Sequence, residues 1–191
     1  MTIGLMGGSF NPVHIGHMMV ASYMAQYAGL DEVWMVLSPQ NPLKESASLI
    51  DDRHRLRMLE IAVSADCRSG IRVCDAELSL PRPSYTIDTL RHLSGRYPST
   101  DFRIITGSDN WARFSQWRES ERILSDYGVI VYPRPGFPVS DPVSPGCRVV
   151  EAPMTEISST FIRQALSRGD DMAYFLPAGV YEYIRHNHLY E

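Results

Sequence analysis

Hydrophobic residues along the chain fall into two kinds of segment. Short apolar runs rich in β-branched residues predict buried strands, at 2–6, 32–37, 71–76, 102–106, 127–132 and 147–152. Longer segments with apolar residues at helical spacing predict helices at 15–28, 51–65, 86–95, 119–125, 159–168 and 177–186. Because the two kinds alternate, the pattern predicts an α/β fold, an open and mostly parallel sheet with helices on both faces.

The length of the chain fits one domain. At 191 residues it can bury a substantial core, and we expect a single domain over 1–191. The last two helical patterns are separated by GDDMAYFLP and not by a strand, which predicts a small C-terminal helical part over 157–191. The proline- and glycine-rich segment 132–147 is typical of a loop.

Composition narrows the class of protein. The chain is 44% hydrophobic and 21% charged, as globular proteins are, and its net charge of -4 disfavours a general nucleic-acid binder. No run approaches the ~20 apolar residues that span a bilayer, and no signal peptide precedes the first strand. Cys67, Cys74 and Cys147 form no C-x-x-C pair, which favours reduced thiols. We therefore expect a cytoplasmic protein without membrane or nucleic-acid partners.

The unusual stretches of sequence follow the predicted strands. Ligands of open α/β sheets bind at the carboxyl edge, where the strand order reverses, so a site is expected there. The stretches that this topology brings to the carboxyl edge are GGSFNPVHIGH, SPQNPLK, GSDNW, PRPG and ISSTFIR.

The first of these stretches combines two glycines with two histidines. Gly7 and Gly8 can adopt positive φ and let a ligand approach the main chain, although an ordinary tight turn explains them equally well. His14 and His17 lie three residues apart at a helix start, where two N–H donors and the helix dipole favour an anion. Either histidine alone fits a structural role or a metal ligand, but no nearby Asp, Glu or Cys completes a metal set.

The stretch ISSTFIR fits the start of another helix. Ser158, Ser159 and Thr160 are good N-cap and first-turn residues, and Arg163 follows one turn later on the same side. The pattern is compatible with a phosphate site and with a plainly capped helix that carries a solvated arginine.

Other candidates have simpler explanations beside the functional ones. Lys44 and Arg134 fit solvated loop cations, and Asp109 is equally suited to cap a helix. Three aromatic residues lie at helical spacing and favour a core position, namely Trp111, Phe114 and Trp117.

Taken together, GGSFNPVHIGH at 7–17 and ISSTFIR at 157–163 resemble the H-x-G-H nucleotidyltransferase superfamily. Within it, PSYTIDTL (83–90), GSDNWARFSQW (107–117), PRPG (133–136) and the C-terminal FLPAGVYEYIRHNHLYE resemble bacterial nicotinate-nucleotide adenylyltransferases. The resemblance covers essentially the whole chain and implies a Rossmann-like fold. It also implies transfer of AMP from ATP to nicotinate mononucleotide, which yields nicotinate adenine dinucleotide and pyrophosphate in NAD biosynthesis.

The resemblance also implies roles for individual residues. The catalytic set would be His14, His17 and Arg163. The ATP-binding set would be Gly7, Gly8, Ser9, Phe10, Lys44, Gly107, Asp109, Ser158 and Ser159. Tyr85 and Thr86 would bind the nicotinate nucleotide, with Trp117 stacked on its pyridine ring. No protein metal site is expected, because Mg²⁺ would arrive on the ATP phosphates.

Two positions depart from the family pattern, and alternatives stay open. Asn11 stands where aspartate is usual, and Leu43 where a histidine often precedes the lysine. Another adenylyl- or cytidylyltransferase, acting on phosphopantetheine or a polyol phosphate, is the nearest alternative function. A nucleotide-binding module without turnover is another, whereas a serine hydrolase lacks the G-x-S-x-G elbow. The sequence is compatible with a homo-oligomer.

Overall fold

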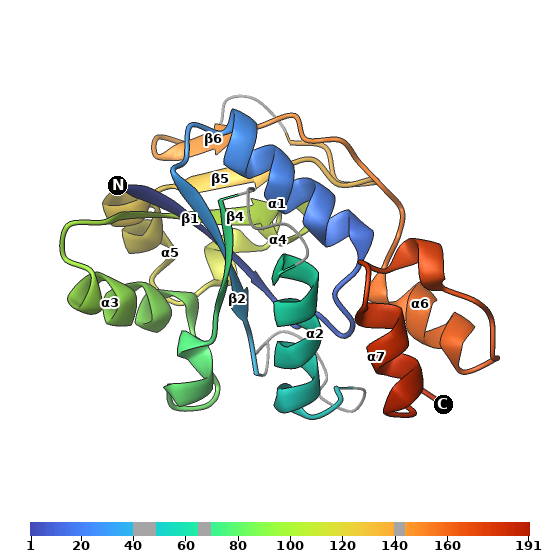
Figure 1. Cartoon of the computed structure of the whole chain (residues 1–191). Helices are drawn as coiled ribbons and strands as arrows, with labels where there is room; N and C mark the ends of the chain where they lie inside the picture. The colour runs from blue at the N-terminus through green and yellow to red at the C-terminus, as the bar shows by residue number, and fades with distance from the viewer. Residues whose placement is uncertain (40–48, 65–69, 140–143) are drawn as a thin grey trace.

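The strands form one parallel sheet in the order β3-β2-β1-β4-β5-β6, shown in the computed structural model of Figure 1. The structure describes residues 1–39, 49–64, 70–139 and 144–191. The strand bounds are β1 Thr2–Gly8, β2 Glu32–Leu37, β3 Ile71–Cys74, β4 Asp101–Gly107, β5 Val129–Tyr132 and β6 Cys147–Val149. The order reverses between β1 and β4, so the predicted open parallel sheet is confirmed and its switch point lies beside β1.

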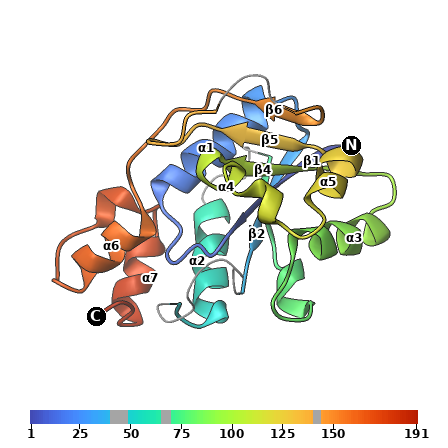
Figure 2. The same ribbon diagram turned by 180° about the vertical axis from the view of Figure 1, so that it is seen from behind.

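Helices cover both faces of the sheet. One face carries α1 (Ile15–Tyr27) and α2 (Asp52–Ser64), and α6 (Ser159–Leu166) and α7 (Val180–His186) lie to the side of the sheet next to them (Figure 1). All four helices contribute to one core cluster. The opposite face carries α3 (Thr86–Arg96), α4 (Ser108–Trp111) and α5 (Ser120–Arg122), which stand in front in Figure 2. The short helical segments are η2 Ala76–Ser79, η3 Phe114–Gln116, η4 Ile123–Tyr127 and η5 Ala173–Phe175.

Burial of both sheet faces explains why the central strands are continuous apolar runs. Along β1, Ile3 and Leu5 belong to the core under α3, whereas Met6 belongs to the core under α1 and α2. In β4, Ile104 and Ile105 divide in the same way. Successive side chains of a strand point to opposite faces, so the buried stretch of a strand covered on both sides carries consecutive apolar residues.

Several predicted elements differ from those observed. The strands expected at 71–76, 127–132 and 147–152 are shorter, and the helix expected at 119–125 is only α5 followed by the π-helical turn η4. Gly128, with φ of 81°, ends that turn. The aromatic residues at helical spacing do not share one helix, because α4 ends at Trp111 and a separate 3₁₀ turn begins at Phe114.

The cysteines and the helix lengths can be compared with the expectations from composition. Cys74 and Cys147 carry free thiols, whereas Cys67 lies outside the described residues. None of the helices in the described part of the chain is both long and apolar enough to cross a bilayer.

Candidate active site

A cavity of 190 Å³ opens at the switch point of the sheet. Strand ends from β1, β2 and β4 form its floor, and the first turn of α3 and the segment around Trp117 form its sides. Its lining combines strand residues Leu5, Gly7, Gly8, Val36, Ile104, Ile105 and Thr106 with the polar groups of Ser38, Glu77, Ser84, Thr86, Thr89, Asn110 and Gln116. The topology therefore brings the stretches after β1, β2 and β4 to one site.

The glycine pair that ends β1 differs from the expectation of positive φ. Neither Gly7 nor Gly8 has positive φ; the residue that does is Phe10, with φ of 43°. A Cβ on Gly8 would lie 2.8 Å from the Phe10 ring, so glycine is needed there for close packing. A Cβ on Gly7 would meet no atom of the described residues within 4 Å. Gly7 thus leaves open space beside the main chain at the cavity wall.

The two histidines form a stacked pair at the start of α1. The centroids of the His14 and His17 rings lie 3.7 Å apart at an interplanar angle of 27°, and Phe10 packs edge-on against His17. The main-chain N–H of His14 donates to Nδ1 of His17 over 3.2 Å, which helps to orient the His17 ring. A Cβ on Gly16 would lie 3.1 Å from Cε1 and Nδ1 of His14. The glycine between the histidines therefore leaves room for the buried ring.

Burial keeps His14 uncharged at neutral pH. Desolvation, and secondly the nearby charge of Arg134, lower the pKa of His14 from 6.5 to about 4. A neutral imidazole donates one N–H to an anion and carries no desolvated charge before the anion arrives. A second, smaller hollow between His14, His17, Tyr132, Arg134 and Thr155 lies beside the pair.

The start of α6 lies against the loop that precedes His14. Ser158 is the N-cap, and its Oγ accepts the N–H of Phe161 over 3.2 Å. Oγ of Ser159 donates to the carbonyl of Pro12 over 2.9 Å, and Nη1 of Arg163 donates to the carbonyl of Asn11 over 2.8 Å. Asn11 and Arg163, which are 152 residues apart in sequence, thereby meet at this loop.

The C-terminal segment contacts the same loop. The Tyr190 hydroxyl donates to Oδ1 of Asn11 over 2.9 Å, and burial raises the pKa of Tyr190. Asn11 is therefore contacted at its side chain by Tyr190 and at its carbonyl by Arg163. The amide that replaces the usual aspartate here serves as a hydrogen-bond acceptor in the buried loop.

The first turn of α3 and Trp117 both line the cavity. Tyr85 is the N-cap of α3 and Thr86 is its first residue, and both line the cavity. The first main-chain N–H groups of a helix have no acceptor within the helix, so this end of α3 supplies donors at the cavity. Nε1 of Trp117 is buried and has no hydrogen-bond partner among the described residues. The Arg118 guanidinium lies 5.0 Å from the centre of the Tyr85 ring.

Gly107 ends β4 and Asp109 lies in α4, but neither residue lines either hollow. The Asp109 carboxylate occupies the place of a Gly107 Cβ and lies 3.9 Å from the Arg134 guanidinium. Lys44 and Leu43 lie outside the described residues. Across the described ranges, no three His, Cys, Asp or Glu residues gather as metal ligands.

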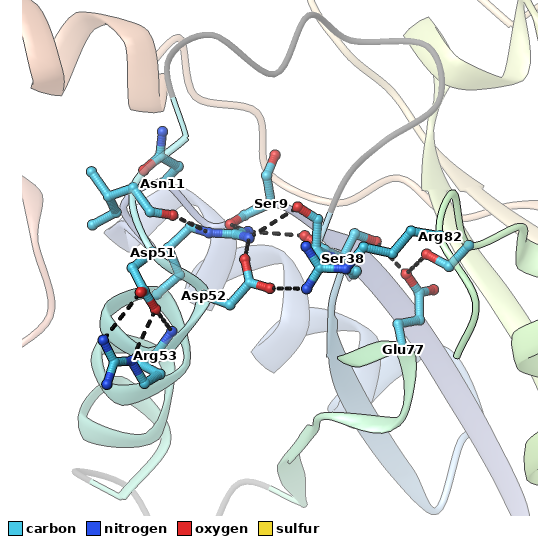
Figure 3. Close-up of polar contacts among 12 residues, drawn as sticks. Ser9, Asn11, Ser38, Asp51, Asp52, Arg53, Glu77 and Arg82 are labelled. Carbon is cyan, nitrogen blue, oxygen red and sulfur yellow. Dashed lines mark hydrogen bonds and ion pairs between the residues drawn. The ribbon is translucent and has the colours of Figure 1, made fainter. Parts of the chain in front are cut away.

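The sequence analysis missed two buried charged residues at the site. Glu77 is a buried carboxylate in the cavity wall, and Arg55 is a fully buried guanidinium behind it. A cation on the apolar face of α2, one turn before Met58 and Leu59, was the available signal for Arg55. Figure 3 shows Glu77 in a polar network with Ser9, Ser38, Asp52 and Arg82. Arg55 belongs to the same network.

Comparison with known proteins assigns the chain to a family and its fold to a known class. A sequence profile of the cytidylyltransferase-like family matches residues 5–165, so the chain belongs to this family of nucleotidyltransferases. Among solved structures, the nicotinic acid mononucleotide adenylyltransferase of Plasmodium falciparum complexed with NaAD has the same fold, with a TM-score of 0.83 at 23% identity. The similarity covers 99% of this chain and 97% of that one.

Curated relatives identify the branch of the family. A probable nicotinate-nucleotide adenylyltransferase of Bacteroides thetaiotaomicron is 52% identical over 95% of this chain and 90% of its own length. One from Flavobacterium johnsoniae is 42% identical over the full length of both chains. The chain is accordingly a member of the nicotinate-nucleotide adenylyltransferase branch, as the motifs predicted.

Proposed function

We propose that this protein transfers AMP from ATP to nicotinate mononucleotide. A 5′-phosphate oxygen of the acceptor attacks the α-phosphorus of ATP and forms a new P–O bond. The bond from that phosphorus to the oxygen bridging to the β-phosphate breaks, and its electron pair leaves on pyrophosphate. The products are nicotinate adenine dinucleotide and pyrophosphate. The observation that carries the proposal is the stacked pair of His14 and His17 at the start of α1, where both rings line the smaller hollow together with Arg134.

The donor side would be formed by the loop after β1 and the start of α6. Gly7, Gly8, Ser9 and Phe10 shape the main chain beside the nucleotide, and Ser158, Ser159 and Arg163 would hold the β- and γ-phosphates, supported by Lys44. Gly107 and Asp109 would lie on the adenosine side. One guanidinium nitrogen of Arg163 donates to the carbonyl of Asn11 and the other to the hydroxyl of Thr160. A phosphate would either compete with these hydrogen bonds or be bound in addition to them.

Catalysis would consist of alignment and stabilisation of charge. The nucleophile is already an anion, so no base has to remove a proton. N–H donors of His14 and His17, aimed at the phosphate oxygens, would stabilise the charge that develops as pyrophosphate leaves. His14 begins uncharged, and the approach of the anionic triphosphate would raise its pKa.

The acceptor would occupy the cavity. The N-terminus of α3 at Tyr85 and Thr86 offers free N–H donors to a carboxylate, and Trp117 offers a flat apolar surface to the pyridine ring. A cavity of 190 Å³ bounded by these groups accommodates an aromatic ring with an anionic substituent.

Magnesium would enter with the donor. The described residues form no cluster of metal ligands, so Mg²⁺ fits here as part of the MgATP substrate, held by phosphate oxygens and water. Bound there, it would neutralise charge on the triphosphate.

The decisive experiment incubates the purified protein with ATP, Mg²⁺ and one acceptor at a time, and measures pyrophosphate and the dinucleotide product. The acceptors are nicotinate mononucleotide, phosphopantetheine and glycerol 3-phosphate. Only the first should support rapid release, and release should stop on removal of Mg²⁺ with EDTA. Faster turnover of phosphopantetheine or glycerol phosphate would reassign the substrate, and turnover of none would favour a binding module.

The variant His17→Ala tests the catalytic role of His17. We expect kcat to fall ~10² to 10³-fold with a small change in KM for ATP, because a donor aimed at developing charge mainly stabilises the transition state. A folded His17→Ala protein with normal kcat would refute the role assigned to His17.

A further inference from the structure

Glu77 is a buried carboxylate that accepts three hydroxyl hydrogen bonds at the cavity wall. Its Oε2 accepts from Oγ of Ser38 over 2.8 Å and from Oγ of Ser84 over 2.9 Å. Its Oε1 accepts from Oγ1 of Thr89 over 3.0 Å. The side chain is only 7% exposed, so these bonds replace the water that the charge would otherwise bind.

Two of the three hydroxyls lie on the segment that faces the acceptor. Ser84 directly precedes Tyr85, the N-cap of α3, and Thr89 lies one turn into that helix. The Glu77 carboxylate accepts hydrogen bonds from Ser84, before Tyr85, and from Thr89, after Thr86. These bonds hold the first turn of α3 in place. Charge-assisted hydrogen bonds are stronger and more directional than neutral ones, so the free N–H groups of that turn are held at a defined position.

The third hydroxyl connects Glu77 to the donor side. Ser38 follows β2, and its carbonyl accepts from Nη1 of Arg55 over 2.9 Å. The same nitrogen donates to the carbonyl of Ser9 in the loop after β1 over 2.7 Å. Ser38 therefore links the buried carboxylate of Glu77, through its hydroxyl, to the buried guanidinium of Arg55, through its carbonyl. Ser9, Ser38 and Glu77 are labelled in Figure 3.

A second tether reaches the start of the acceptor segment. Arg55 is paired with Asp52, whose other carboxylate oxygen lies 2.6 Å from Nη2 of Arg82. Arg82 is two residues before Ser84, so the segment is held at one end by Asp52 and along its length by Glu77. The half-exposed Arg82 pair contributes less than the buried bonds of Glu77.

We propose that Glu77 is a positioning residue that determines acceptor affinity and selectivity by holding Ser84 and Thr89 around the first turn of α3. This inference rests on the proposed function. It assigns to Glu77 no contact with the reacting atoms; the residue acts through the N–H groups that it places. Removing its charge or one of its donors lets that turn shift, which weakens recognition of the nicotinate carboxylate more than it weakens ATP binding.

The test compares Glu77→Gln and Thr89→Val with the wild type. Both substitutions preserve shape, and each removes part of the network. We expect each to raise KM for nicotinate mononucleotide at least ~10-fold, equivalent to ~1.4 kcal/mol, while KM for ATP stays nearly constant. The preference for the acid over nicotinamide mononucleotide should fall in parallel. In the double variant the two effects should be non-additive, because both residues belong to one network.

Glu32→Gln is the matched control. Glu32 is also mostly buried and paired, with Trp34 and Arg72, but it lies at the amino end of β2, away from the cavity. It should alter thermal stability without changing acceptor KM or selectivity. Equal losses for both acceptors and for ATP in Glu77→Gln and Thr89→Val, or a lower KM for the acid, would overturn the positioning role.

Calorimetric titration with nicotinate mononucleotide alone separates this inference from the proposed function. A wild type that binds the nucleotide but forms no product would refute the function, and weaker binding by Thr89→Val would still support the inference. A wild type that neither binds nor turns over nicotinate mononucleotide would overturn both. If Glu77→Gln does not fold, Thr89→Val decides the outcome.

Discussion

Gly16 separates the two histidines, and its replacement by alanine is predicted to slow catalysis by moving His14. An added Cβ would lie 2.8 Å from the Thr155 methyl group and 3.1 Å from two atoms of the His14 ring. The first distance is too short for two carbon atoms, so something must shift. His14 is 3% exposed and stacked on His17, so its ring has little room to move without disturbing the pair.

The expected magnitude follows from these contacts. Overpacking of a buried position costs ~1 to 3 kcal/mol of stability, and Thr155 can relieve part of this by rotating. A ring displaced by up to an ångström no longer directs its donor at the same point, and misplacement on that scale reduces rates by as much as ~10²-fold. We therefore expect a moderate loss of stability and a large loss of kcat, with a smaller change in KM for ATP.

The assay measures kcat at saturating MgATP and nicotinate mononucleotide, together with urea unfolding. Gly95→Ala is the matched control, because a Cβ there meets no described atom within 4 Å. Gly95 lies inside α3, so alanine should stabilise the protein by ~0.5 to 1 kcal/mol and leave kcat unchanged. If Gly16→Ala retained wild-type kcat, the requirement for a glycine between the histidines would be refuted.

Three more predictions follow from the site. The pKa of about 4 for buried His14 lies below its unfolded value of 6.5, so the unfolded chain binds the proton first on acidification. The free energy of unfolding should fall by about 3 kcal/mol between pH 6.5 and 4, and urea titrations of His14→Asn should lack this part of the slope; equal slopes would contradict the prediction. The kcat/KM for nicotinate mononucleotide should exceed that for nicotinamide mononucleotide at least ~10-fold, because the NH₂ group of the amide leaves an N–H donor of α3 unpaired. Trp117→Ala should lower kcat/KM for both acceptors and preserve their ratio. Tyr190→Phe should cost ~1 kcal/mol in urea unfolding and raise KM for ATP by loosening Asn11, which Arg163 also contacts, whereas the exposed Tyr174→Phe should change neither.

The order of strands and helices was predictable because it depends on local patterns. Consecutive apolar residues, such as those at 33–37 and at 104–105, are needed where a strand is covered on both faces, and this requirement is visible in the sequence. The cluster of motifs at the carboxyl edge followed from the topology of parallel strands. The spacing of His14 and His17 at a helix start predicted that both rings can point the same way, and the structure adds that they stack.

The tertiary structure decided features that depend on partners distant in sequence. Glu77 accepts a hydrogen bond from Ser38, which is 39 residues away in sequence, and Asn11 accepts one from Tyr190, which is 179 residues away. No local stretch of sequence contains either pair. Phe10, and not a glycine, takes the positive φ after β1, because its ring packs over Gly8 and against His17. Local periodicity is set by the geometry of one element, whereas a buried charge is stabilised only by groups that the complete fold brings to it.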